Sequence, residues 1–275
     1  MPVLRRVGAS ISYSKTGTGP PVLLIQGVGV IGEGWRPQVD GLSHAFSLIT
    51  FDNRGIGAST RTAGRPLSIE DMAADALAIL DAEEIGRCHV VGHSMGGLIA
   101  QHVALVAPHR VESLALLCTF PYGKCATRVT PRMLVRALRM RVGTRKMRRR
   151  AFLELVMSRT FLRTAPRARL AERLRPLFGH DLAEQPRIVV EQLRAMARYD
   201  MRDRLRELQS VRTLVLSAAQ DRIAPAHYGR ALAAAIPGAK YVELAVRGTV
   251  WQFTRELCSS LARSAAMRRE LVMSS

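Results

Sequence analysis

The chain has 275 residues, of which 48% are apolar and 23% charged. This composition is typical of a folded globular protein and sufficient for one large α/β domain or two small ones. No stretch reaches the 18 consecutive apolar residues of a membrane span, and no apolar run of a secretory signal follows the basic start. The four cysteines lack metal-ligand spacing. We therefore expect a reduced, cytoplasmic protein without metal or cofactor.

The charge is unusual, with 41 Lys and Arg against 22 Asp and Glu, a formal net charge of +19. Residues 122–206 contain 23 of the basic and seven of the acidic residues, a net charge of +16. One segment therefore carries nearly all of the excess. The remaining sequence has the charge balance of an ordinary enzyme-like domain.

Short apolar runs alternate with helical patterns along most of the chain. Ser68 begins one of these helices, because Ser68 and Asp71 have the spacing of a capping box. The expected strands are 4–7, 11–14, 22–26, 47–51, 89–91, 111–117, 213–217 and 241–246, and the expected helices are 68–86, 98–106, 225–236 and one from about 254. Strands that alternate with helices in this way predict a mostly parallel sheet covered on both faces.

The alternation stops between residues 122 and 206, which contain no strand-like run. Arginine-rich helical stretches fill this segment, and we expect interruptions at Pro131, Gly143, Pro166, Pro176 and Pro186. Because strands resume afterwards, the segment is an insertion between two strands. The predicted organisation is an α/β core of residues 1–121 and 207–275 with a helical insertion of residues 122–206.

The sequence Gly92-His93-Ser94-Met95-Gly96 fits the pattern G-x-S-x-G and lies between an expected strand and an expected helix. This context is the one the motif requires. A turn this tight leaves almost no room for side chains at the flanking glycines and exposes the serine Oγ at the end of the strand. Ser94 is therefore a candidate nucleophile, and the N–H of Met95 would face an oxyanion formed beside it.

With this motif the chain resembles the α/β-hydrolase family across nearly its whole length. Gln26-Gly27-Val28-Gly29 stands where the family usually has His-Gly-x-Gly, and Asp52-x-Arg54-Gly55-x-Gly57-x-Ser59 resembles the loop after the next strand. The resemblance implies an α/β-hydrolase fold. It also implies that the Val28 N–H is the second oxyanion-hole donor, that Asp221 is the acid of the triad, and that residues 122–206 form a helical cap over the pocket.

The histidine of the family triad is missing from this sequence. The resemblance places it shortly after the last strand, where the chain has Arg247-Gly248-Thr249, and no histidine follows His227. Thr249 occupies the position of the imidazole. A serine hydroxyl needs a base to accept its proton, and a threonine hydroxyl does not accept protons near neutral pH. We therefore expect weak hydrolytic activity.

Other polar residues have alternative interpretations. His227 is either a substitute base or an exposed histidine at a helix start, and Asp221 is either the acid or a turn residue. His93 is expected to point away from Ser94, and His102 to pack on its helix about 12 Å further along. Asp52 and Arg54 are expected to be structural loop residues; the seven histidines show no metal-ligand spacing.

The basic insertion has three interpretations. It is a solvated face, a surface for an anionic membrane or an acidic partner, or the wall of a pocket for an acidic substrate. Nucleic-acid binding is not expected, because only 5% of the residues are aromatic and no nucleic-acid-binding motif is present.

The leading functional hypothesis is a hydrolase for a small carboxylic ester or lactone. A non-catalytic small-molecule binder that has lost the base is the first alternative, and cofactor-free C–C bond cleavage on the same fold is the second. The sequence leaves the oligomeric state and the substrate open.

Overall fold

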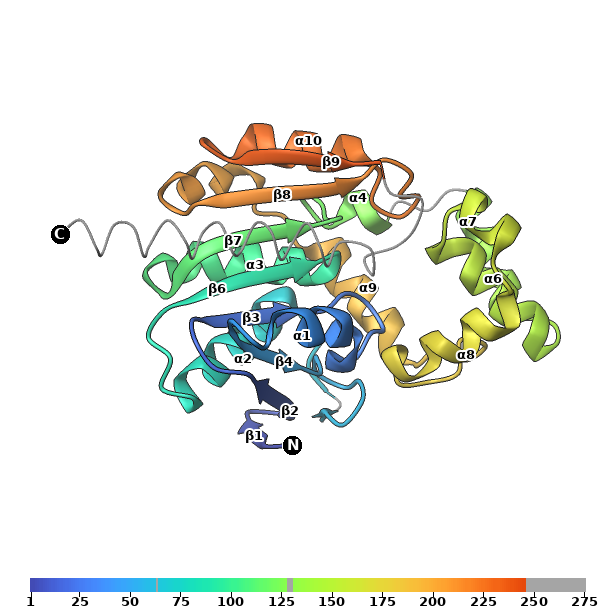
Figure 1. Ribbon diagram of the computed structural model, residues 1–275, viewed down its shortest axis with the longest axis horizontal. Coiled ribbons are helices and arrows are strands. Elements are labelled where there is room, and N and C mark those ends of the chain that lie inside the picture. Colours follow the sequence, from blue (N-terminus) through green and yellow to red (C-terminus); the bar gives the residue numbers. More distant parts are fainter. Residues whose placement is uncertain (63, 128–130, 246–275) are drawn as a thin grey trace.

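The computed structural model describes residues 1–62, 64–127 and 131–245. Within these residues, nine strands form a single sheet (Figure 1). The strands are β1 (Val3–Arg6), β2 (Ala9–Thr16), β3 (Pro21–Ile25), β4 (Ser47–Phe51), β5 (Thr60–Arg61), β6 (Cys88–His93), β7 (Val111–Leu117), β8 (Thr213–Ala218) and β9 (Lys240–Leu244).

The strand order is β1-β2-β4-β3-β6-β7-β8-β9, with β5 paired to β2. β2 runs antiparallel to its neighbours, whereas all pairings from β4 to β9 are parallel. The chain order reverses at β3, which has β4 on one side and β6 on the other. In open parallel sheets this reversal leaves a crevice at the carboxyl ends of the strands, where ligands usually bind.

Alternate strand residues supply two core clusters on opposite faces. Leu23 and Ile25 of β3 pack with α2 (Ile69–Ala82), α3 (Met95–Val106) and α10 (Ala226–Ala235). Val22 and Leu24 pack on the other face with α1 (Arg36–Leu42) and the preceding 3₁₀ turn (Gly32–Trp35). Because each face is covered, the central strand β3 is apolar along its whole length rather than alternating.

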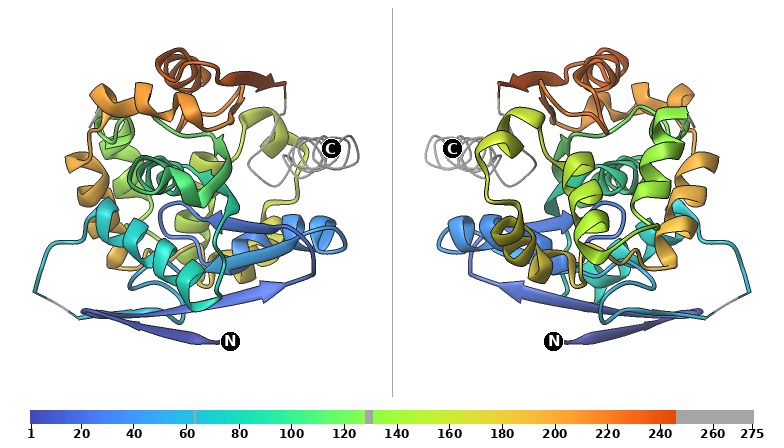
Figure 2. Two further views of the ribbon diagram at one scale, coloured as in Figure 1. Left: turned by 90° about the vertical axis from the view of Figure 1, so that its left-hand side faces the viewer. Right: turned by 90° about the vertical axis from the view of Figure 1, so that its right-hand side faces the viewer.

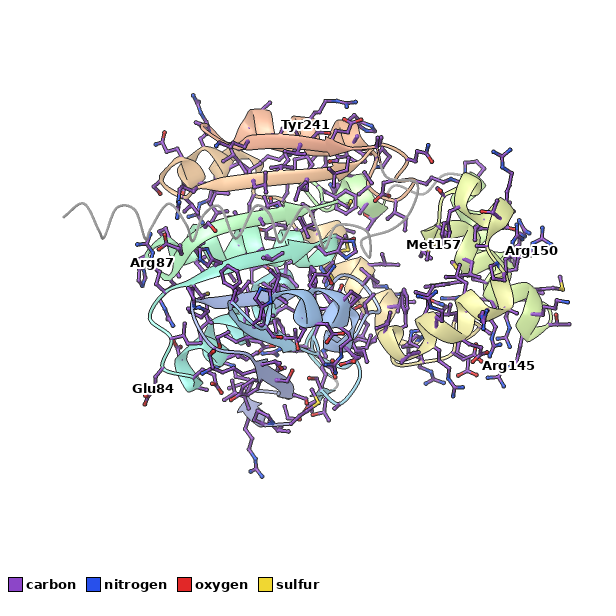
Figure 3. The ribbon with its side chains drawn as sticks, viewed as in Figure 1. Glu84, Arg87, Arg145, Arg150, Met157 and Tyr241 are labelled. Carbon is purple, nitrogen blue, oxygen red and sulfur yellow. The ribbon has the colours of Figure 1, made fainter. Side chains whose placement is uncertain are left out.

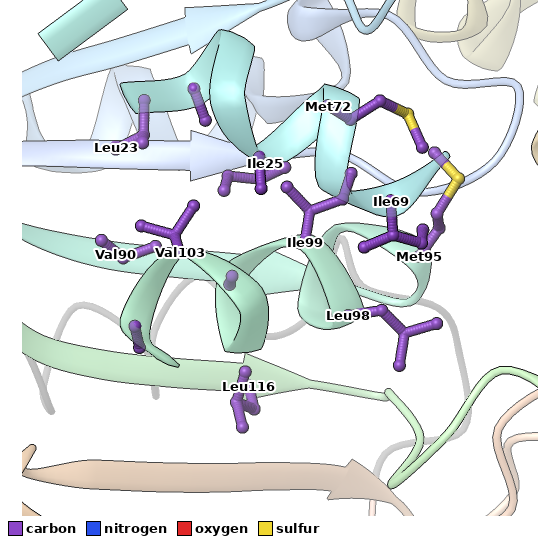
Figure 4. Close-up of a cluster of buried hydrophobic side chains, with 14 of the residues drawn as sticks. Leu23, Ile25, Ile69, Met72, Val90, Met95, Leu98, Ile99, Val103 and Leu116 are labelled. Carbon is purple, nitrogen blue, oxygen red and sulfur yellow. The ribbon is translucent and has the colours of Figure 1, made fainter. Parts of the chain in front are cut away.

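The cluster around α3 fixes the helix that follows the G-x-S-x-G motif. Figure 4 shows Leu23, Ile25 and Val90 of the strands facing Ile99 and Val103 of α3, and all five side chains are fully buried. Burying side chains of this size stabilises the fold by about 1.5–3 kcal/mol each. The first turn of α3 is therefore held firmly against the ends of β3 and β6.

The described part of the segment between β7 and β8 contains six α-helices: α4 (Lys124–Thr127), α5 (Pro131–Arg139), α6 (Arg145–Val156), α7 (Arg159–Thr164), α8 (Arg167–Phe178) and α9 (Ile188–Arg198). Helices α6, α7 and α8 lie beyond the carboxyl ends of the parallel strands (Figures 1 and 2). They share an apolar cluster that includes Phe152, Leu174 and Phe178, and Val30 of the loop after β3 joins it. A 3₁₀ turn (Arg202–Ser210) then returns the chain to the sheet. The predicted domain boundaries themselves stay a prediction.

The expected start of the helix at Ser68 is confirmed. Ser68 caps α2, because its Oγ accepts the N–H of Asp71 at 3.0 Å and donates to the Asp71 carboxylate at 2.8 Å. One expectation is wrong, since Pro176 lies inside α8 instead of interrupting it. A proline removes one N–H from the ladder, and here the helix ends only two residues later at Phe178, followed by Gly179 in the left-handed conformation. The expected C-terminal helix lies outside the described residues.

Sequence periodicity missed two short elements of the core. The two-residue strand β5 and the seven-residue helix α1 are too brief to show a repeat. Among the described residues, no helix is long and apolar enough to cross a bilayer.

Candidate functional site

Ser94 lies at a strained turn between β6 and α3. Its backbone has φ 54° and ψ −118°, in the left-handed half of the map that residues with a Cβ rarely adopt. Three hydrogen bonds hold this conformation. The Ser94 N–H donates to the Leu117 carbonyl at 3.0 Å, and the Ser94 carbonyl accepts from the Gly97 N–H at 2.9 Å and from the Thr119 hydroxyl at 2.6 Å. Strain maintained by its surroundings is characteristic of functional sites.

The flanking glycines are required by close backbone approach. A Cβ on Gly92 would lie 2.2 Å from the Gly96 carbonyl oxygen, and a Cβ on Gly96 would lie 2.1 Å from the carbonyl oxygen of Ile25. Both contacts are with main-chain atoms, which cannot move aside as a side chain can. The spacing of the motif thus follows from the fit of the turn against β3.

Two backbone N–H groups adjoin Ser94. Met95 is the first residue of α3, so its N–H has no carbonyl one turn earlier in the helix. In the loop after β3, Gly27 lies so close that an added Cβ would be 3.1 Å from the Ser94 Cβ. The Val28 N–H follows it and has no hydrogen-bond partner among the described residues. The predicted oxyanion-hole pair therefore comes from adjacent strand ends, beside the positive end of a helix.

Asp221 lies after β8 at the same edge of the sheet. Its Oδ1 accepts the N–H groups of Ile223 at 2.7 Å and Ala224 at 2.8 Å, as in a turn. Burial raises the pKa of the Cys118 thiol, and the neighbouring Asp221 carboxylate raises this pKa further. Cys118 directly follows β7, whose last residue accepts the N–H of Ser94. Asp221 and Ser94 thus flank the end of the same strand. Thr249 lies outside the described residues.

The histidines occupy different environments. His227 is exposed, and its ring packs on Tyr228 with centroids 4.1 Å apart. His102 packs edge-on against Tyr199. Next to Ser94, the Nδ1 of His93 is buried without a hydrogen-bond partner, and burial lowers the pKa of this imidazole to about 4. None of the hydrogen bonds within the described part of the chain joins a histidine to Ser94 or Asp221.

Asp52 and Arg54 hold the loop after β4. The buried Asp52 carboxylate accepts the N–H groups of Gly32 at 2.7 Å and Ala58 at 2.8 Å. Arg54 donates two hydrogen bonds to the buried carboxylate of Asp75 in α2. These contacts support the structural role expected for both residues. Across the described ranges, no group of three His, Cys, Asp or Glu side chains could hold a metal ion.

Sequence analysis missed Gln192, which connects α9 to the loop after β3. The side chain is fully buried on α9, and its Oε1 accepts the N–H of Gly29 at 2.9 Å. The neighbouring Val189 would lie 3.0 Å from a Cβ on Gly29, so the helix touches this loop directly. The available signal was a glutamine among Ile188, Ala195 and Met196, on the buried face of α9.

Comparison with known proteins places this geometry in a family. Residues 20–248 match the family model described as the alpha/beta hydrolase fold. RutD of Azorhizobium caulinodans, provisionally named a carbamate hydrolase, is 31% identical over 244 residues, 89% of each chain.

Two solved structures have the same architecture at 26% identity and a TM-score of 0.76. The alignment with the enol-lactonase of Burkholderia xenovorans LB400 covers 96% of this chain and 100% of the enol-lactonase chain. The alignment with Est816, described as an N-acyl homoserine lactone degrading enzyme, covers 95% of this chain and 99% of the Est816 chain. The chain is therefore a member of the alpha/beta hydrolase fold family.

Proposed function

We propose that this protein hydrolyses a small carboxylic ester or lactone with Ser94 as the nucleophile. The observation that carries the proposal is the conformation of Ser94, which is held at positive φ between β6 and α3 beside two N–H groups. This arrangement is the strand–turn–helix context that a nucleophilic serine needs. Membership of a family of hydrolases supports the reaction class.

In this mechanism the Ser94 Oγ attacks the carbonyl carbon and forms a tetrahedral intermediate. The N–H groups of Met95 and Val28 stabilise the negative oxygen, because they are fixed before the reaction and need no reorganisation. Collapse of the intermediate breaks the acyl C–O bond. The Ser94 proton passes to solvent, and the leaving alkoxide takes a proton from solvent; in a lactone the resulting hydroxyl stays attached to the acyl group. Water then hydrolyses the acyl-serine, which releases the acid and restores the Ser94 hydroxyl. Asp221 is the acid whose family role is to orient a base.

The base is the weak point of the site. Thr249 stands in the family position of the histidine, and threonine does not accept the Ser94 proton near neutral pH. Loss of the base from a complete serine triad costs about 10⁶-fold in turnover. An oxyanion hole and substrate binding alone retain about 10³–10⁴-fold over water. The proposed activity is therefore slow.

The relatives narrow the substrate class. The enol-lactonase and Est816 are named for lactones and RutD for carbamates. All of these substrates present an acyl carbon to a nucleophile. We therefore place a cyclic or short-chain ester first among candidate substrates.

The test restores the base. Thr249→His should raise the hydrolysis of p-nitrophenyl acetate by on the order of 10³-fold or more, and Ser94→Ala in the same background should abolish the gain. A pH–rate profile of the restored enzyme should inflect near the pKa of an imidazole. Ordinary enzyme rates in the unchanged protein, lost on His227→Ala, would show that Thr249 does not mark the missing base.

A non-catalytic binder is the second candidate, favoured by the absence of a histidine beyond residue 227 in a chain that keeps the nucleophile turn. Under this hypothesis Thr249→His gives no gain. Calorimetric titration with a lactone such as γ-butyrolactone, which the unchanged protein would bind without turnover, then separates the two candidates.

A further inference from the structure

The cap carries a basic groove that the proposed reaction does not use. It has a volume of about 650 Å³ and is formed by the turn after α5, by α6 and by the start of α9. Its lining includes Arg141, Arg148, Arg187 and Arg194. Four arginines that converge on one groove from three chain segments create a strong positive potential.

Helix α9 separates this groove from the nucleophile. Ile188 and Gln192 lie on its buried face, where Gln192 contacts Gly29 in the loop after β3. Arg187, Val190 and Arg194 line the groove. Residues three, four and seven apart share one face of a helix, so the two sets lie on different sides of α9. The groove is thus distinct from the site at Ser94.

The positive charge of the groove is not neutralised within the described residues. Its two carboxylates, Glu184 and Glu191, are bonded to Arg145 and Arg61, neither of which lines the groove. Arg141, Arg148, Arg187 and Arg194 have no carboxylate partner in the described part of the chain. The groove therefore presents four unpaired guanidinium groups, whose geometry suits phosphate oxygens.

Two donors at the groove are buried without an acceptor in the described structure. They are the Nε of Arg148 and the Nε2 of Gln185. Buried donors nearly always have a partner, because an unpaired one loses its hydration without compensation. A ligand rich in acceptor oxygens would satisfy both donors.

Apolar side chains project from the same end of the cap. Leu134, Val135 and Leu138 of α5, Val142 of the following turn, and Met147 of α6 are between 56% and 64% exposed. Figure 3 shows Arg145 and Arg150, which form ion pairs within the cap, on the side of the cap turned away from the sheet. Exposed apolar groups beside unpaired arginines are the pattern of a helix that lies in the interface of an anionic bilayer. A free phosphate would leave the apolar groups unexplained.

We propose that the outer face of the cap docks on an anionic lipid surface. The arginines of the groove bind the phosphate of a headgroup, and the apolar side chains of α5 enter the interfacial layer. A lipid phase fits better than an acidic polypeptide, because protruding side chains can enter fluid acyl chains without a matching pocket. This proposal does not depend on the chemistry at Ser94.

The test is flotation of the full chain with vesicles of phosphatidylcholine alone and vesicles that also contain phosphatidylglycerol. We expect binding only to the anionic vesicles, and loss of binding at high salt because the interaction is electrostatic. Arg141→Glu with Arg194→Glu should weaken binding about tenfold or more. The matched control is Arg36→Glu with Arg212→Glu, which replaces two exposed arginines outside the helical cap. This control variant has the same net charge as the groove variant and should bind vesicles like the wild type.

Leu134→Ser with Leu138→Ser tests the apolar contribution and should also weaken vesicle binding. Thermal unfolding of each variant checks that the fold is retained. Equal binding by the groove and control variants, or no binding to anionic vesicles, would overturn the proposal. Binding of inorganic phosphate to the groove without vesicle binding would overturn it in favour of a soluble anion site. A third outcome would favour an acidic partner and overturn the lipid proposal. In that outcome polyglutamate displaces the protein from the vesicles, and the two leucine substitutions do not change vesicle binding.

Discussion

At the scale of single residues, the approach of two main-chain segments decides which side chains the nucleophile turn accepts. Gly96→Ala places a Cβ 2.1 Å from the Ile25 carbonyl oxygen. We expect this substitution to lower the free energy of unfolding by about 1–3 kcal/mol, because the backbone must shift. Urea denaturation measures the loss. Gly86→Ala, whose Cβ would meet nothing within 4 Å, is the control and should change stability by less than about 0.5 kcal/mol.

Gln192 gives a second prediction at this scale. Gln192→Leu leaves the buried N–H of Gly29 without an acceptor, and we expect a loss of about 1 kcal/mol. The loss is moderate because leucine also removes the unpaired Nε2 of the glutamine. In the Thr249→His background the substitution should also lower esterase activity. Gly29 directly follows Val28, so a loosened Gly29 also loosens the proposed oxyanion-hole donor, the Val28 N–H.

Exposed Gln209 supplies the control for this experiment. Gln209→Leu should leave both stability and activity near those of the parent. If the two leucine variants behave alike, the bond from Gln192 does not position the loop.

The predictability of site residues depends on how local their signals are. Ser94, Met95 and the glycines around them lie within one pentapeptide, so the sequence alone brings them together. Gln192 and Gly29 are 163 residues apart, and only the folded cap makes them neighbours. Thr119 was missed for a similar reason, because its bond to the Ser94 carbonyl requires β6 and β7 to be paired. The roles of Asp221 and Thr249 stay predictions.

At the scale of elements, a buried ion pair fastens the loop after β4 to α2. Asp75 is 1% exposed and receives hydrogen bonds from Arg54, one of them at 2.8 Å. Asp75→Ala should cost about 3–5 kcal/mol in urea unfolding, because Arg54 is left buried and unpaired. By contrast, Glu33→Ala breaks a pair with Arg36 in which both side chains are exposed, and should cost less than about 1 kcal/mol. Equal losses would mean that burial does not set the strength of these pairs.

Elements were predictable where packing reinforces a regular pattern. The parallel strands are short and mostly apolar, and helices separate most of them. Their type and their succession along the chain therefore follow from periodicity. Helix α3 begins at Met95, three residues before the apolar repeat indicated, because glycines carry no hydropathy signal. Pro176 was misjudged because a proline near the end of a helix disturbs only the last turn.

At the scale of the whole molecule, His93 and Asp181 contribute to the acid sensitivity of the fold in successive ranges of pH. Burial lowers the pKa of His93 to about 4 from 6.5, so between these values the unfolded chain binds a proton that the folded chain does not. Stability therefore falls by about 3 kcal/mol as the pH drops through this range.

Hydrogen bonds from Arg149 hold the pKa of Asp181 well below its usual 3.8. The contribution of Asp181 to the free energy of unfolding is therefore present above pH 3.8 and disappears at lower pH. Urea unfolding across this pH series should show both losses. His93→Asn should reduce only the upper loss and Asp181→Asn only the lower one, while substitution of exposed His109 by Gln should leave both unchanged. A wild-type stability that stays constant between pH 6.5 and 4 would contradict the burial of the His93 ring.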